Sequence, residues 1–144
     1  MYSDFEESDE KTSKDYQPLV LIVDNDRDNL LFASCVIESL GMRYVVTDDS
    51  KECLGLVCQL LPDVILLDIV MPEIDGLEIT RMIREKVEIS HIPIVAVTGL
   101  TKQEDRIKLF EVGCDDYLCK PYLIEELEFK IYSCLKCRLI LTQK

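Results

Sequence analysis

Five short apolar runs recur along the chain, and each is followed by a longer stretch with helical spacing. The runs are 19–23, 44–47, 63–68, 92–99 and 116–119. The helical stretches are 27–40, 50–60, 77–86, 101–113 and 123–141. Alternation of this kind requires right-handed crossovers, so it predicts a parallel sheet covered by helices on both faces. No repeat or linker interrupts the pattern, which predicts one α/β domain over residues 18–140.

Capping signals mark several of the expected helices. Asp49 with Glu52, and Thr101 with Glu104, have the spacing of a capping box. Gly41 is a natural residue to end the helix that begins at position 27.

Polar residues stand at the carboxyl ends of four of the apolar runs. They are Asp24, Asn25, Asp68, Thr98 and Lys120. In open parallel sheets, ligand sites form outside the carboxyl ends of the strands, so we expect these side chains to share one edge. A helix cap, a strand-end threonine and a solvated lysine would explain each residue alone. Their coincidence at one edge favours a functional site.

The residue types at this edge favour phosphoryl transfer. Acids that lie close together repel each other unless a cation joins them, and oxygen ligands of this kind suit Mg²⁺ or Mn²⁺. Asp68, the last residue of its run, can act as a nucleophile toward a phosphoryl group. Lys120 offers a compact positive charge, and Thr98 a hydroxyl donor, for the phosphoryl oxygens.

The motifs "VDND", "LLDIVMPEIDG", "VTG" and "DDYLCKPY" together resemble those of response-regulator receiver domains of two-component signalling. The resemblance covers roughly residues 18 to 138, and the "LLDIVMPEIDG" block with a distant "KP" is its most specific part. It implies a flavodoxin-like, doubly wound sheet of five parallel strands in the order 2-1-3-4-5, with five helices in three layers.

By this resemblance, Asp68 would be the phosphoacceptor. Asp24, Asn25, Asp68 and the backbone carbonyl of Val70 would bind the metal. The family normally has an acid where this chain has Asn25, so we expect weaker, though not abolished, Mg²⁺ binding. Asp26 could compensate, although alternation along the strand would direct its side chain away from that of Asn25.

The resemblance also assigns the residues that would respond to the phosphoryl group. Thr98 and Lys120 would bind it, and Thr98 and Tyr117 would form the switch, with the aromatic ring turning inward. Lys120–Pro121 would be a cis peptide bond, which is plausible at a tight turn that forms a site.

Two positions resemble those that tune the lifetime of the phosphoryl group in receivers. Val70 and Leu100 lie two residues after Asp68 and Thr98. Because neither side chain can orient a water molecule by a hydrogen bond, we expect a long-lived phosphoryl aspartate. The simpler explanation is that both continue a neighbouring apolar surface.

The implied function is that of a phosphoacceptor module, which catalyses only its own phosphorylation and dephosphorylation and is otherwise not an enzyme. Its donor would be a histidine kinase or a histidine phosphotransfer protein. The helix after 101, the strand 116–119 and the last helix would form a docking surface. That surface would serve an unidentified downstream protein or a second copy in a homodimer.

Two other functions fit parts of the sequence. A pseudo-receiver, which binds partners without phosphorylation, is supported only by Asn25. A haloacid-dehalogenase-type phosphatase would use Asp24 as nucleophile and Asp26 as acid/base. It is disfavoured because the chain has no cap-sized insertion and Lys120 is followed by proline rather than by acids.

Charge and hydropathy limit the remaining classes. The net charge of −12 argues against direct nucleic acid binding through phosphates. No apolar stretch approaches the roughly 18 residues of a membrane span, and no signal peptide is evident, so a cytoplasmic protein is expected. The segment 1–17, acidic and without periodicity, is expected to be an unstructured leader. Too few residues follow position 138 for an output domain, whether the chain is a stand-alone receiver or a fragment.

The chain contains seven cysteines, two of which form a CxxC at Cys134 and Cys137. The surrounding pattern is helical, and His91 is the only histidine that could join a metal site. We therefore expect buried, reduced thiols rather than a metal or redox centre.

Overall fold

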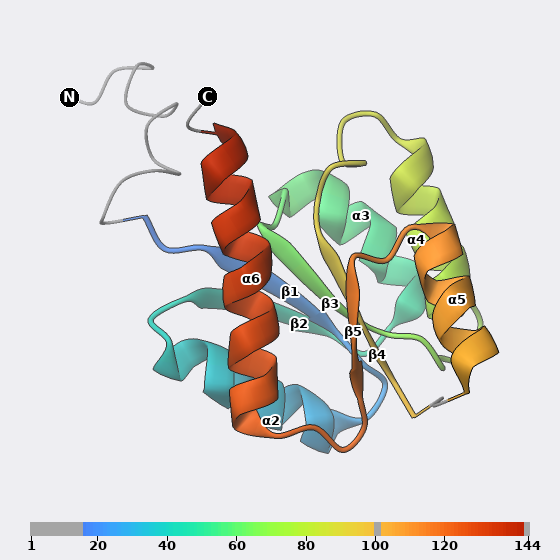
Figure 1. Cartoon of the computed structure of the whole chain (residues 1–144), viewed down its shortest axis with the longest axis horizontal. Coiled ribbons are helices and arrows are strands. Elements are labelled where there is room, and N and C mark those ends of the chain that lie inside the picture. Colours follow the sequence, from blue (N-terminus) through green and yellow to red (C-terminus); the bar gives the residue numbers. More distant parts are fainter. Residues whose placement is uncertain (1–15, 100–101, 143–144) are drawn as a thin grey trace.

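A five-stranded parallel sheet forms the centre of the protein (Figure 1). The computed structural model describes residues 16–99 and 102–142, with side chains as far as Lys136. The strands are β1 (Leu19–Val23), β2 (Arg43–Thr47), β3 (Val64–Asp68), β4 (Ile94–Thr98) and β5 (Asp116–Cys119). Their spatial order is β2-β1-β3-β4-β5, which confirms the predicted order.

Five helices connect and follow the strands. They are α2 (Arg27–Ser39), α3 (Ser50–Leu60), α4 (Gly76–Glu85), α5 (Gln103–Val112) and α6 (Ile124–Thr142). Helices α2 and α6 cover one face of the sheet, and α3, α4 and α5 cover the other (Figure 1). The predicted three-layer, doubly wound α/β architecture is therefore confirmed.

Two apolar cores, one on each face of the sheet, hold the layers together. The core under α2 and α6 joins Val20 and Ile22 of β1 to Ile37 and Leu127 of the two helices. The opposite core joins alternate strand residues, among them Leu21, to α3, α4 and α5. The three inner strands are buried along their whole length because both faces are covered, which explains their unbroken apolar sequences.

The edge strand β2 differs from the inner strands in its burial. Tyr44 and Val46 are both about two-fifths exposed, although they pair with fully covered residues of β1. Only one neighbour flanks this strand, which leaves its outer margin open to solvent.

The helix termini follow most of the predicted signals. Gly41 has a left-handed backbone (φ 76°) just beyond α2, and Asp49 caps α3 by accepting a hydrogen bond from the Lys51 amide. Glu52 does not complete a capping box, because its carboxylate accepts from the Thr47 hydroxyl instead. The predicted start of α5 at Thr101 is displaced: Lys102 is the N-cap and has no side-chain cap bond, while Thr101 lies outside the described residues.

Tyr16 and Gln17, the last two residues of the segment expected to be a leader, contact the domain. Tyr16 donates a hydrogen bond to Asp63 at 2.6 Å, and the Gln17 carbonyl accepts one from Arg43. Both residues are thereby joined to the domain, whereas residues 1–15 lie outside the described part of the chain. None of the helices in the described segments combines the length and apolar character that crossing a membrane requires.

The cysteines are only partly as expected. Cys53 and Cys114 are buried, but Cys35 and Cys58 are exposed because they lie on the outer faces of α2 and α3. Cys134 is half-buried, and the side chain of Cys137 lies outside the described part.

Candidate functional site

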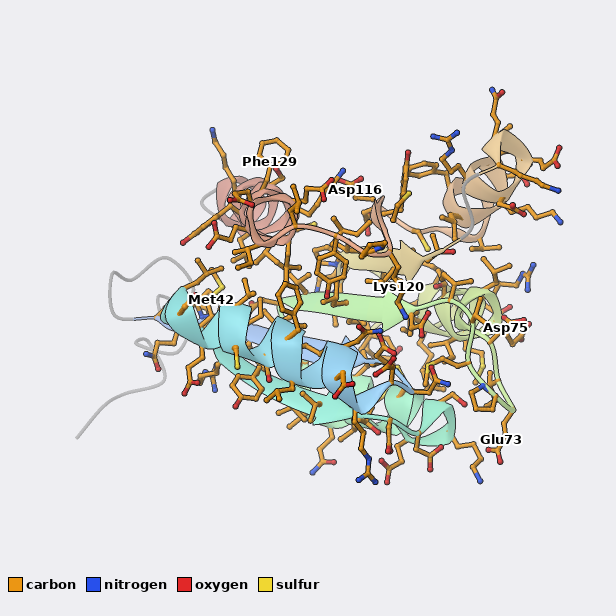
Figure 2. The ribbon with its side chains drawn as sticks, turned by 90° about the horizontal axis from the view of Figure 1, so that it is seen from below. Met42, Glu73, Asp75, Asp116, Lys120 and Phe129 are labelled. Carbon is orange, nitrogen blue, oxygen red and sulfur yellow. The ribbon has the colours of Figure 1, made fainter. Side chains whose placement is uncertain are left out.

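Two aspartates and one lysine meet at the carboxyl edge of the sheet. Because β1 and β3 are neighbours in register, Asp24 and Asp68 leave the sheet side by side. The Lys120 ammonium lies 3.3 Å from Asp24 Oδ2 and 3.1 Å from Asp68 Oδ2. Both carboxylates are nearly inaccessible to solvent, at 5% and 3% exposed. Figure 2 shows Lys120 where β3 ends, far from Met42 at the opposite end of the sheet.

Backbone amides hold the other oxygen of each carboxylate. The Asp26 amide donates to Asp24 Oδ1 at 2.9 Å, and the Val70 amide donates to Asp68 Oδ1 at 3.2 Å. Each bond closes a short turn just after a strand, so the carboxylates are fixed by the chain that follows them. Each oxygen keeps a second lone-pair direction for another ligand.

The neighbouring charges change the pKa values of both Asp68 and Lys120. Burial and the neighbouring charge of Asp24 raise the pKa of Asp68 to about 6, against the opposing effect of Lys120. Burial lowers the pKa of Lys120, but Asp24 and Asp68 outweigh it, and the net pKa is raised. Lys120 therefore stays charged while Asp68 remains an acid of reduced strength.

Thr98 is the last residue of β4, and Lys120 directly follows the neighbouring strand β5. Thr98 is fully buried at the end of β4, and its carbonyl accepts a hydrogen bond from the Lys120 amide at 2.8 Å. The Lys120–Pro121 peptide bond is cis. The end of β5 is thus joined to β4 directly before the lysine leaves the sheet.

The loop after β3 packs tightly against the chain that carries Asp68. A side chain at Gly76 would place a Cβ 2.7 Å from both the Asp68 carbonyl oxygen and Ile69 Cα, so this position requires glycine. Asp75 caps α4 by accepting from the Glu78 amide. Ser50 fastens the loop to α3 by donating to the Pro72 carbonyl.

Asn25 and Asp26 have different environments from Asp24. Both are exposed, and the Asp26 carboxylate accepts from the Asp28 and Asn29 amides as the N-cap of α2. Asp26 is therefore engaged at the helix, which does not favour the acid/base role that a phosphatase would require.

The remaining predicted residues lie around this centre. Val70 is 61% exposed beside Asp68. Tyr117 is half-buried on β5, where Arg106 of α5 donates to its hydroxyl at 3.2 Å. Leu100, the second residue predicted to tune lifetime, lies outside the described part of the chain.

The donor set fits a hard cation. Asp24 and Asp68 are paired carboxylates held close enough for one to raise the pKa of the other. Among the described residues no group of three His, Cys, Asp or Glu side chains is placed to hold a metal. By the resemblance, Asn25 would stand where a third acid is expected. Two carboxylates with amide and carbonyl oxygens remain an oxygen-only set of the kind that Mg²⁺ prefers.

Several residues that shape this edge were not identified from the sequence. Gly76 belonged to a recognised turn, but its close approach to Asp68 depends on tertiary packing. Tyr122 lies near Asp24, since burial and that charge raise its pKa to about 12. Arg106 contacts Tyr117 across two elements, and no local pattern predicts that contact.

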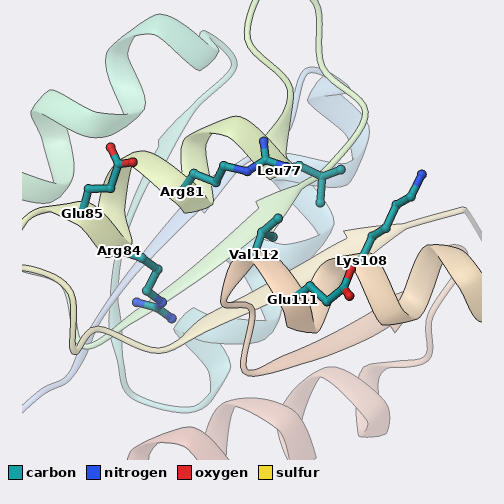
Figure 3. A pocket seen from close by; sticks show the side chains of 7 residues that line it. All are labelled: Leu77, Arg81, Arg84, Glu85, Lys108, Glu111 and Val112. Carbon is teal, nitrogen blue, oxygen red and sulfur yellow. The ribbon is translucent and has the colours of Figure 1, made fainter.

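A surface groove of about 660 Å³ lies between α4 and α5, away from these residues (Figure 3). Leu77 and Val112 form its apolar part, and charged side chains of both signs surround them. None of the predicted site residues lines it.

A family model described as the response regulator receiver domain matches residues 20–132. The probable transcriptional regulator ycf27 of Guillardia theta is 38% identical over 117 residues, covering 81% of this chain and 45% of that protein. The polar-differentiation response regulator DivK of Brucella anthropi is 35% identical over 102 residues, covering 71% of this chain and 83% of that protein. The chain thus spans less than half of the first relative and most of the second.

Solved structures show the same likeness in three dimensions. The receiver domain of the Francisella response regulator 1452 has a TM-score of 0.79 and 31% identity, over 85% of this chain and 99% of that one. A putative response regulator from Chloroflexus aurantiacus has a TM-score of 0.80 and 28% identity, over 83% and 98% of the two chains.

Proposed function

The chain belongs to the response-regulator receiver family, and from that premise we propose that it accepts a phosphoryl group on Asp68 from a phosphohistidine. The observation that carries the proposal is the shared lysine: one ammonium contacts two buried carboxylates, one of which is made less acidic by the other. A structural ion pair needs only one acid, whereas an acceptor site needs a nucleophile and a second group for a cation.

Asp68 is suited to the nucleophilic role in its observed position. With a pKa of about 6 it is about nine-tenths ionised near pH 7, so its oxygen can attack phosphorus. The P–N bond of the phosphohistidine breaks, its electron pair returns to the imidazole, and that nitrogen takes up a proton. The product is a mixed anhydride between Asp68 and phosphate.

The surrounding residues supply charge and orientation. Lys120 exchanges one of its carboxylate contacts for a phosphoryl oxygen, and Thr98 offers its hydroxyl to another. Asp24, Asn25, Asp68 and the Val70 carbonyl would hold Mg²⁺ or Mn²⁺. When bound, the cation neutralises charge on the transferring group.

We further propose that phosphorylation alters the face formed by α5, β5 and α6. Tyr117 lies at this face, on the strand next to the one that carries the buried Thr98, and exposed apolar side chains on and beside α5 and α6 surround it. These are Ile107 and Phe110 of α5, Leu123 just before α6, and Ile124, Phe129 and Tyr132 of α6. Figure 2 labels Phe129 and Asp116, which belong to α6 and β5 of this face. Such a patch suits a downstream protein or a second copy of the chain.

The donor would be a histidine kinase or a histidine phosphotransfer protein, and the reaction would take place in the cytoplasm. The chain would act as a switch rather than as an enzyme with an external substrate. Asn25 is compatible with this function, since an amide oxygen is also a ligand for a hard cation. The pseudo-receiver alternative gains no support from a site with Asp24, Asp68 and Lys120 in contact.

Intact mass spectrometry tests the proposal. After incubation with acetyl phosphate and Mg²⁺, we expect one added phosphoryl group, absent when Mg²⁺ is chelated and absent in Asp68→Ala. Asp26→Ala, which alters an adjacent acid used only as a helix cap, serves as the matched control and should still be phosphorylated. An unmodified wild-type protein under all these conditions contradicts the proposal.

A further inference from the structure

We propose that Arg106 is a positioning residue that holds Tyr117 in its outward position and so opposes the phosphorylation switch. This inference rests on the proposed function, because it concerns the residue that would report the state of Asp68. It assigns to α5 a restraint that the protein has to release before Tyr117 turns toward Thr98.

The outward position of Tyr117 is fixed from several directions. The Arg106 guanidinium donates to the Tyr117 hydroxyl at 3.2 Å and lies 6.0 Å from the centre of the ring. The Lys130 ammonium lies 5.7 Å from the same ring while it pairs with Asp116 at 2.7 Å. Phe110 packs edge-on against the ring, with centroids 6.1 Å apart.

These contacts differ in what they require of the ring. The two cations need only the face of the ring, and the T-shaped contact with Phe110 fixes no single atom of it, so these contacts tolerate modest movement. The hydrogen bond from Arg106 instead fixes the hydroxyl, the atom farthest from the backbone. Arg106 therefore determines the side-chain rotamer, while Lys130 and Phe110 contribute packing.

The register of β4 and β5 places Tyr117 beside Ala96 and near Thr98. Tyr117 pairs with Ala96 on β4, and Thr98 lies two residues further along the same face. Ala96, fully buried, has the smallest side chain of β4. A ring that turns inward over Ala96 approaches Thr98 and, in doing so, gives up the hydrogen bond to Arg106.

Phosphorylation and the Arg106 contact therefore compete for the position of one side chain. If Asp68 binds a phosphoryl group best with Tyr117 inward, the apparent affinity falls with the fraction of molecules that hold it outward. Releasing the restraint should raise that affinity without any change at the carboxylates.

The test measures binding of beryllofluoride, a phosphoryl mimic, in the presence of Mg²⁺ by isothermal titration calorimetry. Arg106→Met should tighten binding by about three- to tenfold, because it removes one hydrogen bond to a charged group. Lys108→Met is the matched control, since Lys108 is an exposed cation on the same helix without a contact to Tyr117, and it should bind like wild type. In a Tyr117→Phe background, which lacks the hydroxyl, Arg106→Met should give no further gain. Unchanged or weaker binding by Arg106→Met overturns the inference.

A second readout separates this inference from the proposed function. In ligand-free protein labelled with 3-fluorotyrosine, the ¹⁹F signal of Tyr117 is identified by its loss in Tyr117→Phe. The signal should shift in Arg106→Met and stay in place in Lys108→Met. If wild type does not bind beryllofluoride, the proposed function fails, and the restraint is then judged by this signal alone. An unmoved signal in Arg106→Met refutes the restraint.

Discussion

The two ends of the sheet both bury aspartates, but they treat them differently. At the amino end, Asp63 is 2% exposed and accepts hydrogen bonds from the Leu19 amide and the Tyr16 hydroxyl. At the carboxyl end, Asp24 and Asp68 are equally buried but share the single ammonium of Lys120. At the amino end two neutral donors contact one acid, while at the carboxyl end one cation contacts two acids.

A second aspartate at the amino end, Asp115, is exposed and pairs with a cation, but it too has a structural role. Asp115 accepts from the Ile94 amide and from Arg84, whose guanidinium also donates to the carbonyls of Gly113, Ser90 and Ile92. This arrangement joins α4 to the starts of β4 and β5. The comparison indicates that burial of an acid does not by itself identify a functional site; what distinguishes the carboxyl end is that two buried acids share one cation.

The largest effect on stability is expected at the amino end. Asp63→Ala should lower the free energy of unfolding by about 2–4 kcal/mol, because it leaves the Leu19 amide without its acceptor. Urea denaturation measures this loss. Asp48→Ala removes an exposed acid and should cost no more than about 0.5 kcal/mol. Equal costs for the two variants would erase the distinction between a buried structural acid and a surface one.

At the carboxyl end, substitution of Asp68 should raise the free energy of unfolding rather than lower it. The pKa of Asp68 is raised from 3.8 to about 6, so the folded protein binds this proton more tightly than the unfolded chain. Its ionisation therefore lowers wild-type stability as the pH rises through this range. Asp68→Asn should stabilise the protein at about pH 8 by about 2 kcal/mol, below a ceiling of roughly 3 kcal/mol for two pKa units.

The pH dependence of the stability gain shows whether it comes from removing the charge of Asp68. The gain of Asp68→Asn over wild type should be small at about pH 3, where the carboxyl is protonated in both the folded and the unfolded protein. It should reach roughly half of its final size at about pH 5 and level off above about pH 7. Paired urea denaturations across this range measure it. A gain that does not change with pH would show that the charge of Asp68 is not its source.

Magnesium affinity is a further property in which the carboxyl end of the sheet should differ from the amino end. Asn25→Asp adds a third carboxylate to the acidic edge and should tighten Mg²⁺ binding by about tenfold, or roughly 1.4 kcal/mol. Tyrosine emission, aided by Tyr122 beside Asp24, and calorimetry can both follow the titration. Asn29→Asp makes the same chemical change at the start of α2 and should have little effect. Equal affinities of wild type and Asn25→Asp would contradict a ligand role for residue 25.

The smallest expected effect concerns the lifetime of the phosphoryl group. Val70 is exposed beside Asp68, and an amide there can hydrogen-bond a water molecule that valine cannot. Val70→Asn should shorten the half-life of the phosphorylated protein by about two- to fivefold, within 1 kcal/mol. Val87→Asn, at an exposed position on the loop after α4, is the control. A half-life as long in Val70→Asn as in wild type would remove Val70 from this role.

The strands and the carboxyl edge could be predicted because their signals are local. A run such as 63–68 is apolar because both sheet faces are covered, and parallel strands bring their ends to one edge whatever the loops do. Asp24, Asp68 and Lys120 were therefore placed together from spacing and alternation. The strand order was supplied by the resemblance, since alternation alone fits more than one order.

The contacts that could not be predicted join residues far apart in sequence. Tyr16 and Asp63 are separated by 47 positions, and nothing in the acidic segment that contains Tyr16 marks its last residues as ordered. Glu52 has the spacing of a capping box but bonds to Thr47, because a hydroxyl from the preceding strand competes with the backbone amide. The contact of Arg106 with Tyr117 likewise depends on how α5 packs beside β5.

The central claim is that the carboxyl edge, and Asp68 within it, carries the chemistry. Borohydride reduces an acyl phosphate of aspartate to homoserine, so peptide mass mapping after treatment with acetyl phosphate, Mg²⁺ and borohydride locates the acceptor. We predict homoserine at position 68 alone, with Asp63 and Asp24 unmodified. Homoserine at position 24, at position 63 or at no position would contradict the assignment of Asp68 as the phosphoacceptor.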